Sequence, residues 1–208
     1  MAQFFSLHPE QPQARLIRQA AEIIRAGGVV ALPTDSAYAL ACQVGDAALL
    51  ERVRRIRGVD DRHHFTLLCR DLSEIGTYAR VDNSQYRLLK ATTPGPYTFI
   101  LEGTKELPRR VLHPKRKTIG LRVPENKVAL ALLAELGEPL LTSTLMLPGD
   151  ESPLTEGWEI QDRLDDLIEL ILDGGYCGTE PTTVVDLTNW PPELVRAGRG
   201  SLEPFGFE

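Results

Sequence analysis

Short apolar segments of strand length recur along the chain, and their arrangement is the feature that most restricts the fold. Residues 29–34 (VVALPT) form a continuous apolar run ended by Pro33, as expected of a strand buried on both faces. Further strands are predicted at residues 65–69, 97–101, 118–123, 139–144, 167–172, 182–187 and 193–197. Helices with one apolar side are predicted at residues 13–26, 47–57, 71–79, 84–91 and 127–136. Because helices separate the early strands and the later strands follow one another, we predict a single α/β domain over residues 1–208, with a mixed, twisted, open sheet flanked by helices.

Composition and cysteine content narrow the class of protein. A chain of 208 residues with 42% hydrophobic and 25% charged residues is near the globular average, which excludes disordered and fibrous classes. The first residues, MAQFFSLHPEQPQ, lack a basic segment followed by an apolar run, and no stretch approaches the roughly 18 apolar residues of a membrane span. The three cysteines are odd in number and lack Cys-x-x-Cys spacing. The sequence therefore predicts a cytoplasmic protein with reduced thiols, no membrane partner and no disulfide.

The charge of the chain is unevenly distributed. The first basic segment, residues 52–70, holds six arginines against two aspartates, and the second basic segment, residues 105–122, holds seven lysines or arginines against one glutamate. Residues 150–173 carry nine acids against one arginine, within a chain of formal net charge -6. Like charges repel unless an anion or an acidic partner offsets them. We expect the two basic segments to meet in a concave basic groove, although each run alone could simply be a solvated face.

Familiar catalytic motifs are missing, and polar residues gather where strands end. The sequence contains no Gly-x-x-x-x-Gly-Lys-Ser/Thr, Gly-x-Gly-x-x-Gly or Gly-x-Ser-x-Gly motif, and its histidines lack zinc-ligand spacing. Open α/β sheets bind ligands at strand ends. Hydroxyls or guanidinium groups that could hold a small polar substrate and phosphate oxygens occur in or next to predicted strands and helices at Thr34, Ser143, Thr144, Thr182, Arg55, Arg57, Arg122 and Arg196.

Several of these segments, taken in order, resemble the YrdC/YciO family over about residues 13–201. The segment GGVVALPTDSAYALAC resembles the family's first strand and Pro-Thr-Glu/Asp motif, RRIR resembles its Lys-x-Arg, and TPGPYTFIL resembles its Trp-Pro-Gly-Pro-x-Thr. The segments IGLRVPENKVALALL, LLTSTLMLPG, PTTVVDL and VRAG follow in the family's order. Within the family the chain looks most similar to the YciO branch.

The resemblance implies a fold, a chemistry and roles for residues. Members have a twisted α/β sheet with a concave, positively charged surface that binds nucleotide and RNA, and synthase members condense threonine, bicarbonate and ATP into threonylcarbamoyl-AMP, an intermediate in tRNA modification. By this resemblance, ATP is a substrate accompanied by Mg²⁺, and no tightly bound cofactor or protein-held metal is expected. The implied roles are catalytic for Arg55 and Arg57, amino-acid binding for Thr34, Tyr38 and His63, and nucleotide or phosphate binding for Arg122, Ser143, Thr144, Thr182 and Arg196.

Two positions depart from the family pattern. His63 and His64 stand where the family has Lys-Pro, so a permanent ammonium is replaced by an imidazole. Met146 stands where the family has an asparagine, so an amide is replaced by a thioether without a donor. Two hypotheses therefore stand: a nucleotidyltransferase of the threonylcarbamoyl-AMP synthase type, or a module that binds double-stranded RNA or tRNA with weak or no synthase activity. A small-metabolite binder is a third alternative, and the oligomeric state is not predicted.

Overall fold

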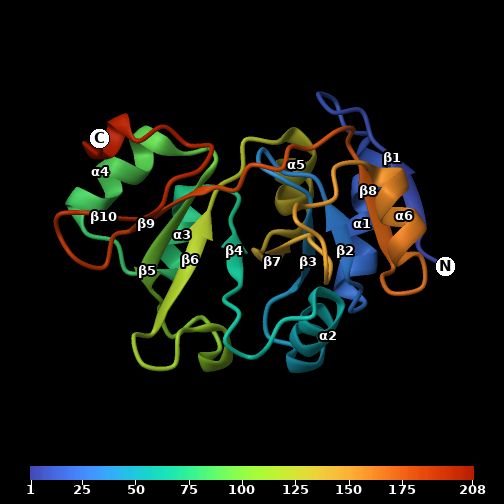
Figure 1. Cartoon of the computed structure of the whole chain (residues 1–208), viewed down its shortest axis with the longest axis horizontal. Coiled ribbons are helices and arrows are strands. Elements are labelled where there is room, and N and C mark those ends of the chain that lie inside the picture. Colours follow the sequence, from blue (N-terminus) through green and yellow to red (C-terminus); the bar gives the residue numbers. More distant parts are fainter.

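One ten-stranded mixed sheet runs through the whole molecule. The structure is a computed structural model that describes residues 1–208. The strands lie in the order β1-β8-β2-β3-β7-β4-β6-β5-β9-β10, with four parallel and five antiparallel neighbouring pairs. In Figure 1 the N-terminal strand and β10 lie at opposite ends of the molecule. The predicted single α/β domain with a mixed sheet flanked by helices is confirmed.

The strands are β1 Gln3–Ser6, β2 Val30–Leu32, β3 Ala39–Gln43, β4 Thr66–Leu68, β5 Tyr97–Glu102, β6 Thr118–Arg122, β7 Leu140–Thr144, β8 Leu170–Asp173, β9 Thr183–Asp186 and β10 Glu193–Arg196. The α-helices are α1 Ala14–Arg25, α2 Ala47–Arg57, α3 Leu72–Tyr78, α4 Asn83–Thr92, α5 Lys127–Leu136 and α6 Gly157–Leu164. Two short 3₁₀ helices, η1 and η2, span Arg109–Val111 and Glu203–Phe205. Three of the strands and α-helices were not predicted: β1, β3 and α6. The two 3₁₀ helices were not predicted either.

Local signals in the sequence set the limits of helix α2. The Asp46 carboxylate accepts hydrogen bonds from the backbone of Ala48 at 2.9 Å and Leu49 at 3.4 Å, which satisfies free amides of the first turn. The helix ends at Gly58, which adopts the left-handed conformation with φ of 64°. Arg57 therefore occupies the last turn, at the point where the chain leaves the helix toward β4.

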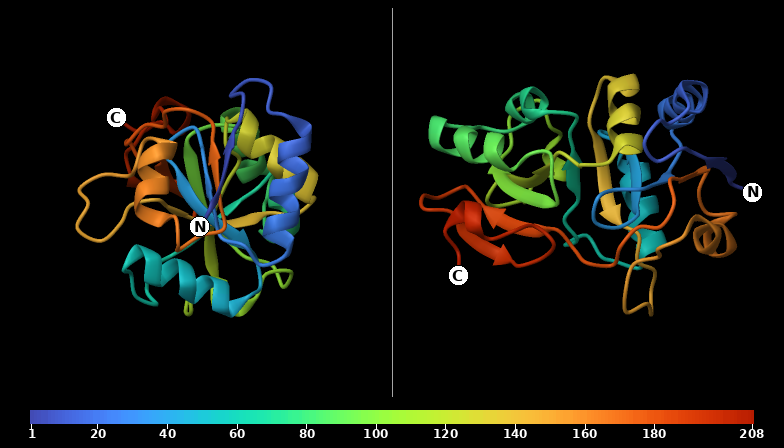
Figure 2. Two further views of the ribbon diagram at one scale, coloured as in Figure 1. Left: turned by 90° about the vertical axis from the view of Figure 1, so that its right-hand side faces the viewer. Right: turned by 90° about the horizontal axis from the view of Figure 1, so that it is seen from above.

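Helices cover both faces of the sheet, but unequally. Helices α1 and α5 pack together on one face over a cluster of 17 buried residues. Helices α2, α3, α4 and α6 contribute to a cluster of 35 buried residues that includes side chains from the other face. The ribbon views in Figure 2 show helices on both sides of the sheet. No residue of an α-helix lines the cavity that opens beside strands β7, β4, β6, β5 and β9. This uncovered stretch of sheet is where the candidate site lies.

The cysteines and the lengths of the helices bear on the class of protein. All three cysteines are free and buried. None of the α-helices combines the length and the apolar character that a membrane span requires.

Candidate functional site

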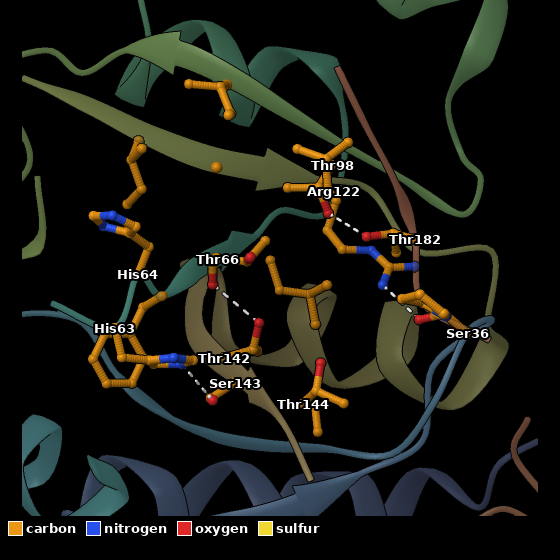
Figure 3. A pocket seen from close by; sticks show the side chains of 18 of the residues that line it. Ser36, His63, His64, Thr66, Thr98, Arg122, Thr142, Ser143, Thr144 and Thr182 are labelled. Atoms are coloured by element: carbon orange, nitrogen blue, oxygen red, sulfur yellow. Dashed lines mark hydrogen bonds between the residues drawn. The ribbon is translucent and has the colours of Figure 1, made fainter. Parts of the chain in front are cut away.

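The floor of the cavity is one face of five neighbouring strands. Side chains alternate between the two faces of a strand, so every second residue faces the cavity. The residues of these strands that line the cavity and follow this alternation, with the residue just before β9, are Thr142, Thr144, Thr66, Leu68, Thr118, Gly120, Arg122, Thr98, Ile100, Thr182 and Val184. Ile119 and Ser143, at intervening positions, also line the cavity. Intervening residues belong to the larger core, among them Leu141, Leu67, Leu121, Phe99 and Val185. The same strands thus supply an apolar core on one side. On the other side they supply a hydroxyl-rich floor, which Figure 3 shows.

The cavity has the chemistry of an anion-binding site. Its volume is about 530 Å³, and no aspartate or glutamate lines it. Nine serine or threonine side chains line it, together with three arginines (Arg116, Arg122 and Arg196) and three histidines (His63, His64 and His113). Guanidinium groups and hydroxyls are the donors that proteins use for phosphate and carboxylate oxygens.

The turn between β2 and β3 is tied to strand β6 by a buried arginine. The Thr34 hydroxyl donates to the Ala37 carbonyl at 2.6 Å and accepts from the Ser36 backbone amide at 3.1 Å. The Arg122 guanidinium donates to the Ser36 hydroxyl at 3.0 Å and forms a buried ion pair with Asp35. Burial lowers the pKa of Arg122, although Asp35 opposes that shift. Thr34 and Arg122 are therefore brought to the cavity by a preformed turn.

Tyr38 lies in the cavity wall, but its hydroxyl is committed elsewhere. The phenol donates to the Gly175 carbonyl at 2.6 Å, and the Asp173 carboxylate lies at 3.3 Å. Burial raises the pKa of Tyr38, and its side chain has no exposed surface. Tyr38 therefore fixes the wall against the segment that follows β8.

Arg57, Ser143 and His63 form a connected group at one end of the cavity. The Arg57 guanidinium donates from Nε to the Met146 carbonyl at 2.8 Å and from Nη1 to the Ser143 hydroxyl at 2.9 Å. His63 Nε2 lies 2.8 Å from the same hydroxyl oxygen (Figure 3). Burial, with the nearby Arg57 charge, lowers the pKa of His63 to about 4, and burial also lowers the pKa of Arg57. His63 is therefore a neutral imidazole at neutral pH.

Thr182 and Arg196 meet at the other end of the floor. The Arg196 guanidinium donates to the Thr182 carbonyl from Nε at 3.1 Å and from Nη2 at 2.9 Å. The hydroxyls of Thr182 and Thr98 share a hydrogen bond of 2.8 Å. Burial lowers the pKa of Arg196, and no carboxylate pairs with it. Thr144, also on the floor, is exposed to the cavity.

The two basic segments meet at the cavity, but mainly through histidines. The His64 and His113 rings stack with centroids 5.4 Å apart and planes at 26°. Both residues line the cavity. Arg55, by contrast, is exposed on α2 and does not line the cavity, so its predicted catalytic role stays a prediction. The remaining predicted site residues line the cavity or, for Arg57, bond directly to a residue that does.

Sequence reasoning missed several lining residues, including Thr66, Thr98, Thr118, Arg116 and His113. A signal for three of them was present, because β4, β5 and β6 each carry a threonine at or next to the strand start with apolar residues between the cavity-facing positions. Arg116 was counted only as part of a charge run. It pairs with Asp186 at 2.6 Å and with the Thr188 hydroxyl at 3.0 Å. No group of three or more His, Cys, Asp or Glu side chains is arranged to hold a metal ion.

Comparison with known proteins agrees with this geometry. The family model described as "Telomere recombination", which covers Sua5, YciO and YrdC proteins, matches residues 22–198. An Escherichia coli (strain K12) protein with the name "Uncharacterized protein YciO" is 58% identical over 205 residues, covering 99% of this chain and 100% of that protein. The crystal structure of E. coli YciO superposes with a TM-score of 0.94 at 57% identity, again over 99% of this chain and 100% of the other.

A more distant relative carries a functional name. The threonylcarbamoyl-AMP synthase of Pyrococcus abyssi is 31% identical over 190 residues, which cover 90% of this chain and 55% of that enzyme. The crystal structure of P. abyssi Sua5 complexed with L-threonine matches with a TM-score of 0.86 at 27% identity, over 94% of this chain and 57% of the other. The family model and both relatives cover far more than half of the chain. The chain therefore belongs to the Sua5/YciO/YrdC family.

Proposed function

We propose that the cavity binds L-threonine, bicarbonate and ATP, and that the chain is a nucleotidyltransferase of the threonylcarbamoyl-AMP synthase type. The observation that carries the proposal is a cavity of about 530 Å³ lined by arginines, histidines and nine hydroxyls without any carboxylate. A site of this composition suits substrates that are all anions or carry an anionic group. The likeness to a synthase of P. abyssi, and to a structure complexed with L-threonine, adds the amino acid.

The reaction needs positioning and charge stabilisation more than acid–base chemistry. The threonine amine first combines with bicarbonate to give a carbamate and water. A carbamate oxygen then attacks the α-phosphorus of ATP, the bond to the bridging oxygen breaks, and pyrophosphate leaves with the electron pair. Negative charge grows on the leaving group, so fixed cations lower the barrier. Mg²⁺ would be bound by the ATP phosphates and would offset part of that charge.

The proposal divides the cavity between the two substrates. Arg57, Arg122 and Arg196 supply cations for the phosphates, and the hydroxyls of Ser143, Thr144 and Thr182 contact the nucleotide. Thr34, Tyr38 and His63 form the side that holds threonine. The turn that carries Thr34 is fixed before substrate arrives, which reduces the entropy lost on binding. This assignment gives Arg55 no contact with either substrate.

The decisive experiment measures pyrophosphate released from ATP with and without L-threonine and bicarbonate. Release that requires both supports the proposal, and release that does not exceed the level without them contradicts it. Arg57→Ala removes a donor close to the proposed phosphates, and we expect a loss of about 10²- to 10³-fold in rate. The matched control is Arg62→Ala, an exposed arginine of the same basic segment that pairs only with Asp60, and its rate should be unchanged. Circular dichroism on both variants separates lost chemistry from lost folding.

A second candidate function is RNA binding at the loop that joins β5 to β6. Five cations there are exposed and make no ion pair: Lys105, Arg109, Arg110, Lys115 and Lys117. They lie in the same segment as Arg116 and His113, which line the cavity. Binding that depends on phosphate contacts weakens linearly with the logarithm of salt concentration. Titration with duplex RNA at several salt concentrations tests this candidate, and an affinity that does not change with salt would contradict it.

A further inference from the structure

Ser143 differs from the other hydroxyls of the cavity because an imidazole accepts its hydrogen bond. Nine serine or threonine side chains line the cavity, and His63 Nε2, at 2.8 Å from the Ser143 oxygen, is the one ring nitrogen bonded to any of them. The hydroxyls of Thr34 and Thr142, by contrast, donate to backbone carbonyls. A hydroxyl is a weak nucleophile until a base takes its proton. Among the cavity hydroxyls, Ser143 alone has such a base in place.

The hydrogen positions in this pair follow from the geometry. The Arg57 guanidinium carries only donors, so the Ser143 oxygen accepts from Arg57 Nη1 at 2.9 Å. The single hydroxyl hydrogen of Ser143 therefore points to His63 Nε2, which must be unprotonated. Burial and the Arg57 charge lower the pKa of His63 to about 4, which also favours the neutral ring at neutral pH. The pair is thus held in the protonation state that general-base activation of a hydroxyl requires.

Arg57 compensates for the weakness of a base with so low a pKa. Its Nη1–H bonds the Ser143 oxygen, so its charge stabilises the negative charge that grows on this oxygen as the proton leaves. The same charge disfavours an imidazolium while the cavity is empty. No carboxylate lines the cavity, so an anionic ligand brings the opposite charge that lets His63 hold the proton. The pair therefore becomes reactive when an anionic ligand is bound.

The pair is open to the cavity and fixed in place. Ser143 and His63 both line the cavity, and Figure 3 shows the bond between them. The His63 ring packs edge-on against Phe65, with centroids 5.4 Å apart and planes at 85°. Ser143 lies within β7 opposite Leu40 of β3, which holds its backbone in position. The Ser143 oxygen accepts one hydrogen bond, so a second lone pair is free to form a bond to a ligand.

Building on the proposed function, we propose that Ser143 is a nucleophile, activated by His63, and that it hydrolyses the carbamoyl adenylate through a covalent serine ester. The proposed function places His63 on the amino-acid side of the cavity and Ser143 on the nucleotide side. The carbonyl carbon that joins the two parts of the adenylate therefore lies beside the pair. The lysine that the family pattern has at position 63 is a protonated donor and could not take the hydroxyl proton.

Each bond change is assigned to one of these groups. The Ser143 oxygen attacks the carbonyl carbon, and His63 Nε2 takes the hydroxyl proton. The bond from that carbon to the bridging oxygen breaks, so AMP leaves with the electron pair, and the proton passes from His63 to solvent. Water then attacks the same carbon and gives a proton to His63, which returns it to the departing Ser143 oxygen. The carbamate that is released takes up a proton and decomposes to the free amino acid and carbon dioxide.

The first test uses acetyl-AMP, which contains the same kind of mixed anhydride and does not have to be made by the protein. AMP release is followed by chromatography, and peptides of the acid-quenched full chain are analysed by mass spectrometry. We expect AMP release above the uncatalysed rate and an acetyl group on Ser143, with Thr142 and Thr144 unmodified as internal controls. Ser143→Ala should lose both, and His63→Gln should slow the release by about 10²-fold. Circular dichroism on both variants separates lost chemistry from lost folding.

The second test supplies ATP, L-threonine and bicarbonate to the wild-type chain. Carbamate esters hydrolyse slowly because the nitrogen lone pair makes the carbonyl carbon less electrophilic, so a threonylcarbamoyl ester on Ser143 should accumulate. Acetylation of Ser143 in the first test without pyrophosphate release in the second would overturn the proposed synthase and leave the nucleophile standing. Pyrophosphate release that requires threonine, without any acyl group on Ser143 in either test, would overturn this inference alone. AMP attached to Ser143 would also overturn it, because the attack would then be on phosphorus.

Discussion

The first and second basic segments look alike in the sequence, yet the fold uses their cations in opposite ways. In residues 52–70, Arg52 pairs with Glu169 at 2.8 Å, and Arg54 pairs with Glu51 and lies over the Phe65 ring at 5.2 Å from its centroid. Arg62 and Arg70 pair with neighbouring aspartates. In residues 105–122, only Arg116 and Arg122 make ion pairs, and five cations stay exposed without a carboxylate.

The difference follows from the elements on which the cations lie. In the first segment, Arg52 and Arg54 lie on α2, whose packing places them against Glu169 and the Phe65 ring. Arg62 and Arg70 lie outside the helix and pair with aspartates close to them in the sequence. Most of the second segment is the loop between β5 and β6, where only Arg116 has a carboxylate partner, Asp186 of β9. The number of like charges in a stretch of sequence therefore does not show how strong the electrostatic field is at the surface of the folded protein. The free positive charge lies on the loop and at the cavity, where a phosphate-bearing partner could neutralise it.

The largest expected effect is on the free energy of unfolding, and it concerns Arg122, the buried residue at the end of the second basic segment. Arg122 pairs with Asp35, and both side chains are less than one tenth exposed. Arg122→Met leaves Asp35 charged and buried without its partner, so we expect a loss of about 3–5 kcal/mol in the free energy of unfolding. Urea denaturation followed by circular dichroism measures it.

A second variant separates the charge effect from the loss of packing. Adding Asp35→Asn to Arg122→Met removes the unpaired carboxylate, so the double variant should recover part of the stability. A double variant as unstable as the sum of the two single ones would mean that the two side chains are not coupled. Arg122 would then, like the exposed cations of the second basic segment, have no carboxylate partner that contributes to stability.

The next test replaces the five exposed loop cations, Lys105, Arg109, Arg110, Lys115 and Lys117, with glutamine. If the loop binds RNA, affinity for a duplex at physiological salt should fall by about tenfold or more, and the salt dependence should become shallower. The free energy of unfolding should change little, because isolated surface substitutions have effects within about 0.5 kcal/mol each. The matched control is Arg62→Gln with Arg70→Gln in the first segment, which should leave the salt dependence nearly unchanged. If the five loop substitutions and the two control substitutions changed RNA affinity and its salt dependence equally, the two basic segments would not differ in how they use their cations.

The sequence was sufficient for most of the sheet but not for the parts that depend on distant partners. Strands such as β2 carry long apolar runs, and α2 carries its own start and stop residues, so local pattern is enough. Strand β1 is short and only half-buried, and it exists because β8 pairs with it in parallel. Strand β3 is rich in alanine, which has little strand preference, and it lies antiparallel between β2 and β7. Helix α6 lies within the acidic run 150–173, for which only the strand at residues 167–172 was predicted.

The candidate site was predictable in its residue types but not in its contacts. Thr34, Ser143 and Thr182 could be selected because hydroxyls at strand ends meet at one crevice. No local signal shows that the Tyr38 hydroxyl bonds to Gly175, 137 positions away, or that Arg55 points out while Arg57 reaches Ser143. On a helix, adjacent or next-but-one residues face different directions, and which of them faces the cavity depends on how α2 packs. Only the three-dimensional arrangement decides that.

The smallest expected effect concerns acid stability in the first segment. Burial and Arg57 keep the pKa of His63 near 4 in the folded protein, whereas an unfolded histidine has a pKa of about 6.5. Below pH 6.5 the unfolded chain therefore takes up a proton that the folded chain excludes. The stability that depends on neutral His63 is complete above about pH 6.5 and is lost as the pH falls toward 4. Because the ring is partly exposed to solvent, we expect only on the order of 1 kcal/mol between pH 7 and pH 4.5. His63→Gln does not titrate, so its urea midpoint should fall less over this range than that of the wild type. If both midpoints fell in parallel, His63 would be as accessible to protons as the exposed residues of the second segment, and its contact with Ser143 and Arg57 would not hold it neutral.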